Sequence, residues 1–174
     1  MSRQITFVLA AVLGLFAPPM TRAETPGSFK DKTATATPSS RPPNVIFLLC
    51  DDLGYGDVGC FGQKKIRTPH IDSLARDGMR LTTHYSGHNV CAPSRCVLMT
   101  GKHPGHAYIR ENRGGLNGAE GQEPVPLGEL ELPKLFKKMG YQIGGFGKWG
   151  LGPVGSTGDP LLQGFDRFFG FNCQ

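Results

Sequence analysis

Apolar and polar residues follow one another in blocks of two different periods, and these blocks predict strands alternating with helices. Residues 44–50 form a short, almost continuous apolar run, which is typical of a strand buried on both faces of a sheet. A polar, glycine-rich turn over residues 51–59 ends this run. We expect two further strands, over residues 79–85 and 141–146.

Two segments between these strands have helical signals. Thr68 is a suitable N-cap, Pro69 suits the first helical position, and Gly78 can end the helix that they start. A second apolar face of helical period covers residues 132–139, and Gly140 is its expected stop.

Strand, helix and strand in repeated order predict an α/β fold, with a mostly parallel sheet flanked by helices and joined by right-handed crossovers. Ligands bind outside the carboxyl ends of the strands in such sheets. Asp51 and Asp52 follow one predicted strand and Lys148 follows another, so we expect them to meet at one edge of the sheet. Cys91 precedes a short apolar run and is expected to open a helix, whose N-terminus favours bound anions.

The amino-terminal part of the chain is expected to lie outside the fold. Residues 1–23 have the pattern of a secretory signal peptide, with Arg3 at the start and an apolar stretch over residues 5–16. This stretch is shorter than the roughly 20 apolar residues that span a membrane, so we expect no stable membrane anchor. Residues 24–43 should form a flexible leader. We therefore expect a secreted or periplasmic protein that is folded over residues 44–174.

The net charge of the chain says little about which class of partner it binds. The chain has 19 basic and 14 acidic residues, and its formal net charge at pH 7 is +5. Loss of the signal peptide would leave an excess of about +3. Because no block of Lys and Arg with interleaved aromatic residues occurs, we expect no nucleic acid partner. The weak positive balance is compatible with an anionic substrate.

Five cysteines in an exported chain would ordinarily suggest disulfides, but the number is odd. At least one cysteine should therefore be unpaired or chemically altered. We expect Cys50, inside the first apolar run, to be a buried small hydrophobic residue. The five are Cys50, Cys60, Cys91, Cys96 and Cys173.

Three ordered motifs point to chemistry on sulfate or phosphate esters. They are the run 44–57 with Asp51 and Asp52, the run Cys91-Ala-Pro-Ser-Arg95 followed by Thr100-Gly101, and the run Gly147-Lys-Trp-Gly150. Together they resemble the amino-terminal half of a type I, formylglycine-dependent sulfatase. The resemblance implies an alkaline-phosphatase-like fold, incomplete here, in which residues 44–174 are the amino-terminal part of the catalytic domain of a sulfuric ester hydrolase.

The resemblance also implies a role for each motif residue. In that family a separate formylglycine-generating maturation enzyme oxidises the cysteine of Cys-x-Pro-Ser-Arg, which implies a Cα-formylglycine aldehyde at Cys91. One hydroxyl of the hydrated aldehyde attacks sulfur and expels the alcohol, and the other later loses its proton so that sulfate is ejected. Asp51, Asp52 and the modified Cys91 would bind one calcium ion. Arg95 would hold the hydrate in place, and Lys148 would neutralise the charge that builds on sulfate.

Two departures from the family pattern matter. Many sulfatases have histidine two residues after the motif lysine, where this chain has Gly150, so the general acid is unassigned. The family's further calcium ligands lie well downstream, whereas this chain ends at Gln174. Two carboxylates cannot supply the about 6 to 8 oxygen ligands that calcium takes. We therefore expect this chain, as a fragment, neither to bind calcium tightly nor to turn over substrate.

Two other functions fit some of the same residues. His84, His88, Cys91 and Cys96 have the residue types of a structural zinc site, which would make the chain a metal-stabilised, non-catalytic module. The other alternative is a phosphatase or phosphodiesterase on the same scaffold, where a serine or threonine usually replaces the cysteine.

We expect a sulfated small molecule or a sulfated polysaccharide as the substrate.

Three further polar residues lie near the motifs. Asp57 is expected to belong to the glycine-rich turn. His103 and His106 follow the motif helix and could face the site.

Overall fold

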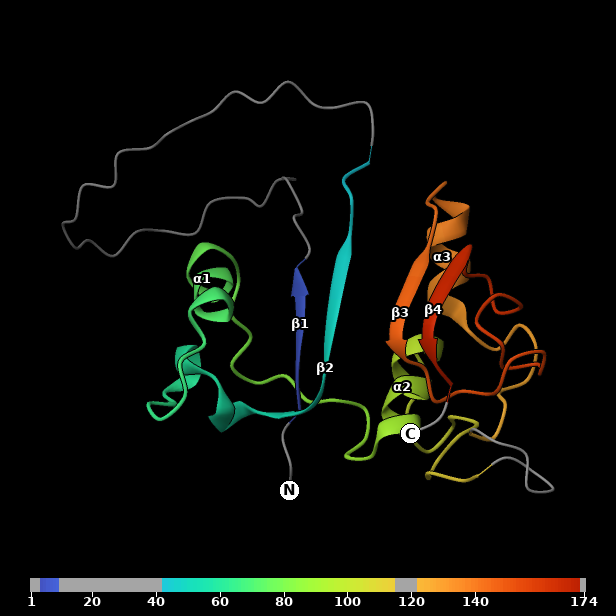
Figure 1. Cartoon of the computed structure of the whole chain (residues 1–174), viewed down its shortest axis with the longest axis horizontal. Coiled ribbons are helices and arrows are strands. Elements are labelled where there is room, and N and C mark those ends of the chain that lie inside the picture. The colour runs from blue at the N-terminus through green and yellow to red at the C-terminus, as the bar shows by residue number, and fades with distance from the viewer. Residues whose placement is uncertain (1–3, 10–41, 115–121, 173–174) are drawn as a thin grey trace, which may run out of the picture. The chain divides into compact units, whose positions relative to one another are not determined.

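The structure, a computed structural model, describes residues 4–9, 42–114 and 122–172. Its elements follow in the order β1 (Gln4–Leu9), β2 (Ile46–Gly54), the short 3-10 helices η1 (Tyr55–Asp57) and η2 (Gly59–Phe61), α1 (Pro69–Asp77), α2 (Cys91–Thr100), α3 (Glu131–Lys138), β3 (Gly144–Lys148) and β4 (Arg167–Phe171) (Figure 1). The strands form two two-stranded sheets, β1 with β2 and β3 with β4. The chain divides into two compact units, Phe7–Leu48 and Met1–Thr6 with Leu49–Gln174, and every candidate site residue belongs to the second.

Helix α1 confirms the expected helix start and end, because it begins after Thr68 and ends before Gly78. The Thr68 hydroxyl does not cap the helix. It accepts the N–H of Gly59 at 2.8 Å and donates to Asp72 at 3.0 Å. Asp72 also accepts the N–H of Cys60 at 2.7 Å. The first turn of α1 is thereby tied to the turn that follows β2.

Helix α3 is shifted by one residue from its expected range of 132–139. Gly140 follows it as expected, and its N–H donates to the Lys137 carbonyl at 2.9 Å. Phe136 packs edge-on against Tyr141 at a ring centroid distance of 5.3 Å, which fixes the chain leaving the helix.

Strands β3 and β4 are parallel, with Lys148 opposite Phe171, and this pairing confirms the expected sheet type. The two strands approach closely at Gly170. A Cβ at that position would lie 1.9 Å from the Gly147 carbonyl oxygen, so only glycine fits there.

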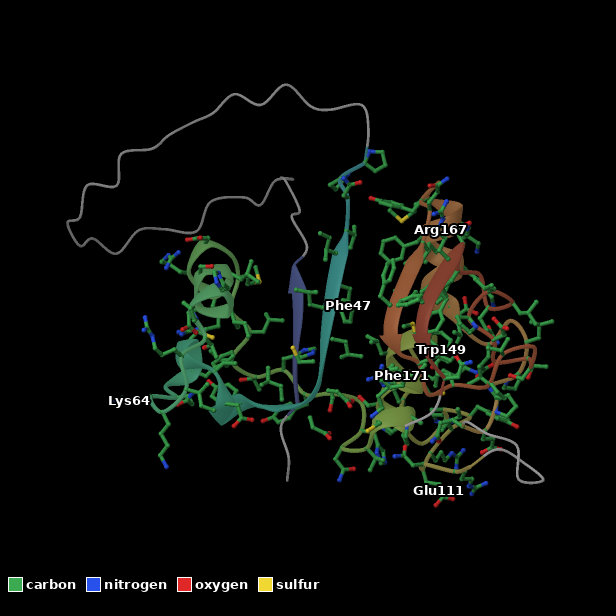
Figure 2. The ribbon with its side chains drawn as sticks, in the orientation of Figure 1. Phe47, Lys64, Glu111, Trp149, Arg167 and Phe171 are labelled. Atoms are coloured by element: carbon green, nitrogen blue, oxygen red, sulfur yellow. The ribbon has the colours of Figure 1, made fainter. Side chains whose placement is uncertain are left out.

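One hydrophobic core joins α2 to this sheet, and Figure 1 shows α2 and α3 beside β3 and β4. Trp149, directly after β3, is 4 % exposed and lies among the packed side chains in Figure 2. Its ring meets Phe165 and Phe168 edge-on, at centroid distances of 5.4 and 5.7 Å. The core therefore holds α2 against the carboxyl end of β3. Its buried members are Ala92, Cys96, Ala107, Ile109, Val125, Leu130, Trp149 and Leu151.

The structure corrects the expected strands. Residues 79–85 are irregular, because no described strand pairs with this segment. Met79 within the segment is 85 % exposed. Strand β3 begins at Gly144 and not at residue 141. Strand β4 is not among the expected strands, since five residues are too few to show a period. Ile46 and Leu48 are 64 % and 56 % exposed, so β2 is not buried on both faces as expected.

Among the five cysteines, Cys50, Cys60, Cys91 and Cys96 are free thiols, and Cys173 lies outside the described residues. Cys50 is only half-buried, because β2 is less covered than its sequence predicts. Cys96 is fully buried in the core.

Most of the expected signal peptide and all but the end of the expected leader, residues 24–43, lie outside the described residues. Within residues 1–23 only β1 is described. Over the described ranges, no helix combines the length and the apolar character needed to cross a bilayer.

Candidate active site

Three separate elements carry the candidate site residues to one place. Asp51 and Asp52 lie in the second half of β2, Cys91 is the first residue of α2, and Lys148 is the last residue of β3. The two strands run further than expected, so the acidic pair and the lysine lie within strands and not just beyond them. Asp51 and Lys148 nevertheless meet as expected, but β2 and β3 belong to two separate two-stranded sheets and not to one sheet.

Asp51 is the centre of the polar contacts. Its Oδ2 accepts from Lys148 Nζ at 2.8 Å, and its Oδ1 accepts from Arg95 Nη2 at 3.1 Å. Lys148 Nζ also lies 3.4 Å from Cys91 Sγ. Arg95 Nη1 donates to the backbone carbonyl of Lys148. One carboxylate therefore links residues that are 44 and 97 positions away in the sequence.

The cations of this cluster are more buried than the carboxylate. The side chains of Arg95 and Lys148 are 12 % and 18 % exposed, whereas that of Asp51 is 38 % exposed. The Nε of Arg95 is buried and has no hydrogen-bond partner within the described part of the chain. A buried donor of this kind costs free energy unless a further acceptor satisfies it.

The ion pairs change the titration of both partners. Partial burial alone would raise the pKa of Asp51, but the hydrogen bonds from Lys148 and Arg95 outweigh it, so the pKa lies below the ordinary value of 3.8. Burial alone would lower the pKa of Lys148, yet its bonds to Asp51 and Cys91 raise the pKa above 10.5. The pair is therefore ionised throughout the neutral pH range.

Asp51, Asp52 and Cys91 form the one group of three potential metal ligands among the residues that the structure describes. One ligand atom of each lies within 4.8 Å of the others. Two ligands of one calcium ion, each about 2.3 to 2.6 Å from it, are at most about 5 Å apart, so this spacing fits a shared ion. Three ligands are fewer than the about 6 to 8 that calcium takes, so these three groups alone would not complete such a site.

Gly150 occupies the position where many sulfatases have histidine. Its φ is +77°, a left-handed conformation that favours glycine over residues with a side chain. Its N–H donates to the Asn172 carbonyl at 3.1 Å, which fixes this conformation at the end of the sheet. Because glycine has no side chain, position 150 offers no group that could donate a proton.

Asp57 and the two histidines after the motif helix do not join the cluster. Asp57 Oδ2 accepts the N–H of Gly54 at 2.6 Å, which places it in the turn, as expected. His103 Nδ1 accepts the N–H of Gly105 at 3.1 Å, and His106 lines a separate cavity of about 530 Å³.

The structure does not bring together the residues of the zinc alternative. His84, His88, Cys91 and Cys96 are all described, yet they form no group with ligand atoms close enough to share a metal. His88 Nδ1 accepts the N–H of Val90 at 3.1 Å, and the Cys96 thiol is buried in the core. The zinc hypothesis is therefore wrong for the residues on which it rested.

One contact next to Cys91 is not predictable from the sequence. Asn112 Oδ1 accepts the N–H of Ala92 at 3.0 Å. Asn112 lies in a long irregular segment, 20 residues beyond its partner, and no periodicity or motif marks it.

Comparison with known proteins gives consistent results. The sequence model of the family described as Sulfatase matches residues 43–173. Steryl-sulfatase of Mus musculus is 40% identical over 144 residues, which are 79% of this chain and 23% of that protein. Arylsulfatase A of Homo sapiens is 40% identical over 140 residues, which are 75% of this chain and 25% of that protein. N-acetylgalactosamine-6-sulfatase of Homo sapiens is 39% identical over 144 residues, or 80% of this chain and 27% of that protein.

A solved structure is similar as well. The crystal structure of Ps i-CgsB in complex with k-i-k-neocarrahexaose has a TM-score of 0.60 and 35% sequence identity, and the match covers 71% of this chain and 27% of that chain. The chain thus spans about a quarter of the length of the proteins that it matches.

Proposed function

Because the chain belongs to the sulfatase family, we propose that it provides the nucleophile, two cations and one side of a calcium site for a sulfuric ester hydrolase. The proposal depends above all on the surroundings of Cys91. Its Sγ lies 3.4 Å from Lys148 Nζ and within 4.8 Å of carboxylate oxygens of Asp51 and Asp52. A potential nucleophile, a fixed cation and hard metal ligands therefore share one small volume.

The charges of this cluster suit an anionic ester once a metal is bound. Asp51 and Asp52 carry two negative charges, and Arg95 and Lys148 carry two positive charges, so these side chains alone balance. A divalent cation would add a positive excess of about two, which attracts a sulfate ester and opposes its release before reaction.

Lys148 is the residue that we assign to charge neutralisation. Its ammonium group is largely buried and lies beside both Asp51 and Cys91. A sulfate group that reacts at residue 91 would lie against this fixed charge. One preorganised donor facing developing negative charge typically lowers a barrier by about 2.7 to 4 kcal/mol.

Arg95 is assigned to holding the site together. It binds the side chain of Asp51 from β2 and the backbone carbonyl of Lys148 from β3, while its own backbone belongs to α2. Because its side chain is 12 % exposed, this connection is well shielded from water. The unpartnered Nε–H leaves Arg95 one further donor for an oxygen of the substrate or of modified residue 91.

We infer that Cys91 is the target of oxidation to formylglycine. Cys91 is a free thiol that is partly accessible, and no disulfide competes for it. Its Sγ therefore stands in for the hydroxyl oxygens of the hydrated aldehyde. When formed, the hydrate supplies two hydroxyls on one carbon, one for attack on sulfur and one for the later release of sulfate.

Asp51, Asp52 and residue 91 are the proposed holders of calcium. The ion, when bound, polarises the sulfate oxygens and favours an ionised nucleophile. The remaining ligands must come from water or from residues outside this cluster, because calcium takes about 6 to 8 oxygens. We therefore expect these three groups alone to bind calcium weakly.

A sulfated saccharide is the substrate class that we favour. Two matched proteins have names or titles that refer to saccharides, N-acetylgalactosamine-6-sulfatase and Ps i-CgsB in complex with k-i-k-neocarrahexaose. Steryl-sulfatase is named for a different substrate class, so a sterol sulfate is the informative comparison in an assay.

The decisive experiment uses the native gene product, produced together with a formylglycine-generating enzyme. It should release sulfate from para-nitrophenyl sulfate, lose this activity in Cys91→Ala, and keep it in the matched control Cys60→Ala. Peptide mass spectrometry should find the aldehyde at residue 91, and chelation of calcium should suppress turnover. Faster hydrolysis of para-nitrophenyl phosphate than of the sulfate, or full activity in Cys91→Ala, would contradict the proposal.

A further inference from the structure

The first turn of helix α2 needs a cap that its own sequence does not provide. Val90, in the N-cap position, forms no side-chain cap. Pro93 has no N–H, and Ser94 already donates its N–H to the Val90 carbonyl at 3.0 Å. The N–H of Ala92 has no acceptor within the helix, and Ala92 is 0 % exposed, so bulk water cannot satisfy it.

Asn112 provides the missing acceptor from a distant part of the chain. Its Oδ1 accepts the N–H of Ala92 at 3.0 Å. Only the amide oxygen can accept this bond, so the contact also fixes which way the side-chain amide faces. The contact is the one that an N-cap residue ordinarily makes to the second residue of a helix.

The bonded N–H belongs to the peptide group between Cys91 and Ala92. Because a peptide group is planar, an acceptor that holds this N–H also holds the Cys91 carbonyl and the ψ angle of Cys91. The direction in which the side chain leaves residue 91 is set by the same backbone. The 3.4 Å approach of Sγ to Lys148 Nζ therefore depends on this hydrogen bond.

The segment that carries Asn112 is itself anchored on α2. Ala107 and Ile109 are 1 % exposed and belong to the same core as Ala92 and Cys96. Asn112 thus reaches the start of α2 from a segment that the core already holds in place.

From these contacts we propose that Asn112 is a positioning residue, which caps helix α2 and thereby fixes residue 91 for reaction. The catalytic part of this inference rests on the proposed function. The cap itself does not, and it has measurable consequences in protein whose Cys91 is still a thiol.

The first test therefore measures the cap without any assay of activity. In Asn112→Ala, amide hydrogen exchange at Ala92 should accelerate at least about tenfold, because the buried N–H has lost its acceptor. The ¹³Cβ resonance of Cys91 should shift as well. Asn112→Asp keeps an oxygen acceptor and should restore both signals. Thr68→Val removes the hydroxyl that accepts the Gly59 N–H at 2.8 Å and donates to Asp72 at 3.0 Å, and it is the matched control at the start of another helix, α1.

The second test measures catalysis in the formylglycine-bearing protein, with kcat expressed per aldehyde. Asn112→Ala should lower kcat about 10- to 100-fold while KM stays within about threefold, because a misplaced nucleophile affects chemistry more than binding. Asn112→Asp should recover most of kcat, and Thr68→Val should lower stability without lowering kcat.

The outcomes separate the two proposals. Unchanged exchange at Ala92 in Asn112→Ala, or lower stability with unchanged kcat, would overturn the role of Asn112. No sulfatase activity in the unsubstituted protein would overturn the proposed function alone. The exchange at Ala92 and the resonance of Cys91 would then still decide whether Asn112 fixes residue 91.

Discussion

Asp51 and Lys148 are 97 residues apart in the sequence, and they form an ion pair of 2.8 Å between the carboxyl ends of β2 and β3. The same lysine reaches Cys91 at the start of α2. Residue 91 of α2 therefore lies beside charged groups of β2 and β3. Its geometry explains why the three sequence motifs occur together in one chain.

Substitution of Lys148 by Met should lower kcat for sulfate esters about 10²- to 10³-fold in the formylglycine-bearing protein, because a fixed cation beside residue 91 is lost. Lys148→Arg should recover only part of this loss, since its planar group has a different reach. The measurement is steady-state hydrolysis of para-nitrophenyl sulfate. Lys102→Met is the matched control, because Lys102 pairs with Glu129 outside the cluster. Equal kcat values for Lys148→Met and Lys102→Met would refute the assignment.

The second prediction concerns acid unfolding and Asp166. Hydrogen bonds from Lys137 and from the backbone N–H of Ile143 hold the pKa of Asp166 below its ordinary value of 3.8. A carboxyl group with a depressed pKa stabilises the fold above the ordinary value, and this contribution is lost as the pH falls through the depressed pKa. Asp166→Asn should therefore lower the urea midpoint at neutral pH, and the two proteins should converge in strong acid.

Lys137→Met serves as the partner variant in the same titration. It removes the ion pair but keeps the bond from the Ile143 N–H to Asp166 at 2.7 Å, so it should lose only part of the effect. A difference between wild type and Asp166→Asn that persists unchanged into strong acid would mean that the ionised carboxylate is not the cause.

The third prediction concerns thiol reactivity. Burial in the core raises the pKa of Cys96, and Cys96 is 0 % exposed, so both the thiolate fraction and the access of reagents are low. In the folded chain, iodoacetamide should label Cys96 at least about tenfold more slowly than the half-buried Cys50. Peptide mass spectrometry over a time course reports both rates. Labelling of Cys96 as fast as Cys50 in folded protein would contradict the packing of α2.

The fourth prediction concerns the sheet that carries Lys148. In Gly170→Ala the new methyl group would lie 1.9 Å from the Gly147 carbonyl oxygen, so β3 and β4 must separate. We expect a loss of about 1 to 3 kcal/mol in the free energy of unfolding. Gly56→Ala is the matched control, because nothing lies within 4 Å of its added Cβ. Denaturant unfolding compares the two, and equal losses would show that the strand contact is not limiting.

The helix ends could be predicted from the sequence because each local signal has a single physical meaning. Thr68 and Pro69 predict the start of α1, and Gly140 predicts the end of α3. Asp51 and Lys148 meet as expected, although β2 and β3 pair in separate two-stranded sheets and both strands extend further than their apolar runs.

The features that the sequence does not predict depend on contacts between distant residues. Residues 79–85 have a strand-like composition, but strands form only where a partner strand pairs with them, and composition does not name the partner. Strand β4 is short, and its pairing with β3 is a long-range property. Asn112 shows the same limit for a single side chain, because its role depends on a backbone donor 20 residues away.

The main-chain path around Gly150 also bears on how members of this family can be interconverted. Gly150 and Gly152 have φ angles of +77° and +141°, so both lie outside the range that side-chain-bearing residues adopt readily. Replacing Gly150 alone by histidine would force a residue with a side chain into a left-handed backbone conformation, at a cost of about 1 to 2 kcal/mol. A graft of the histidine type of sulfatase pocket onto this scaffold should therefore replace the irregular segment that follows β3 together with residue 150.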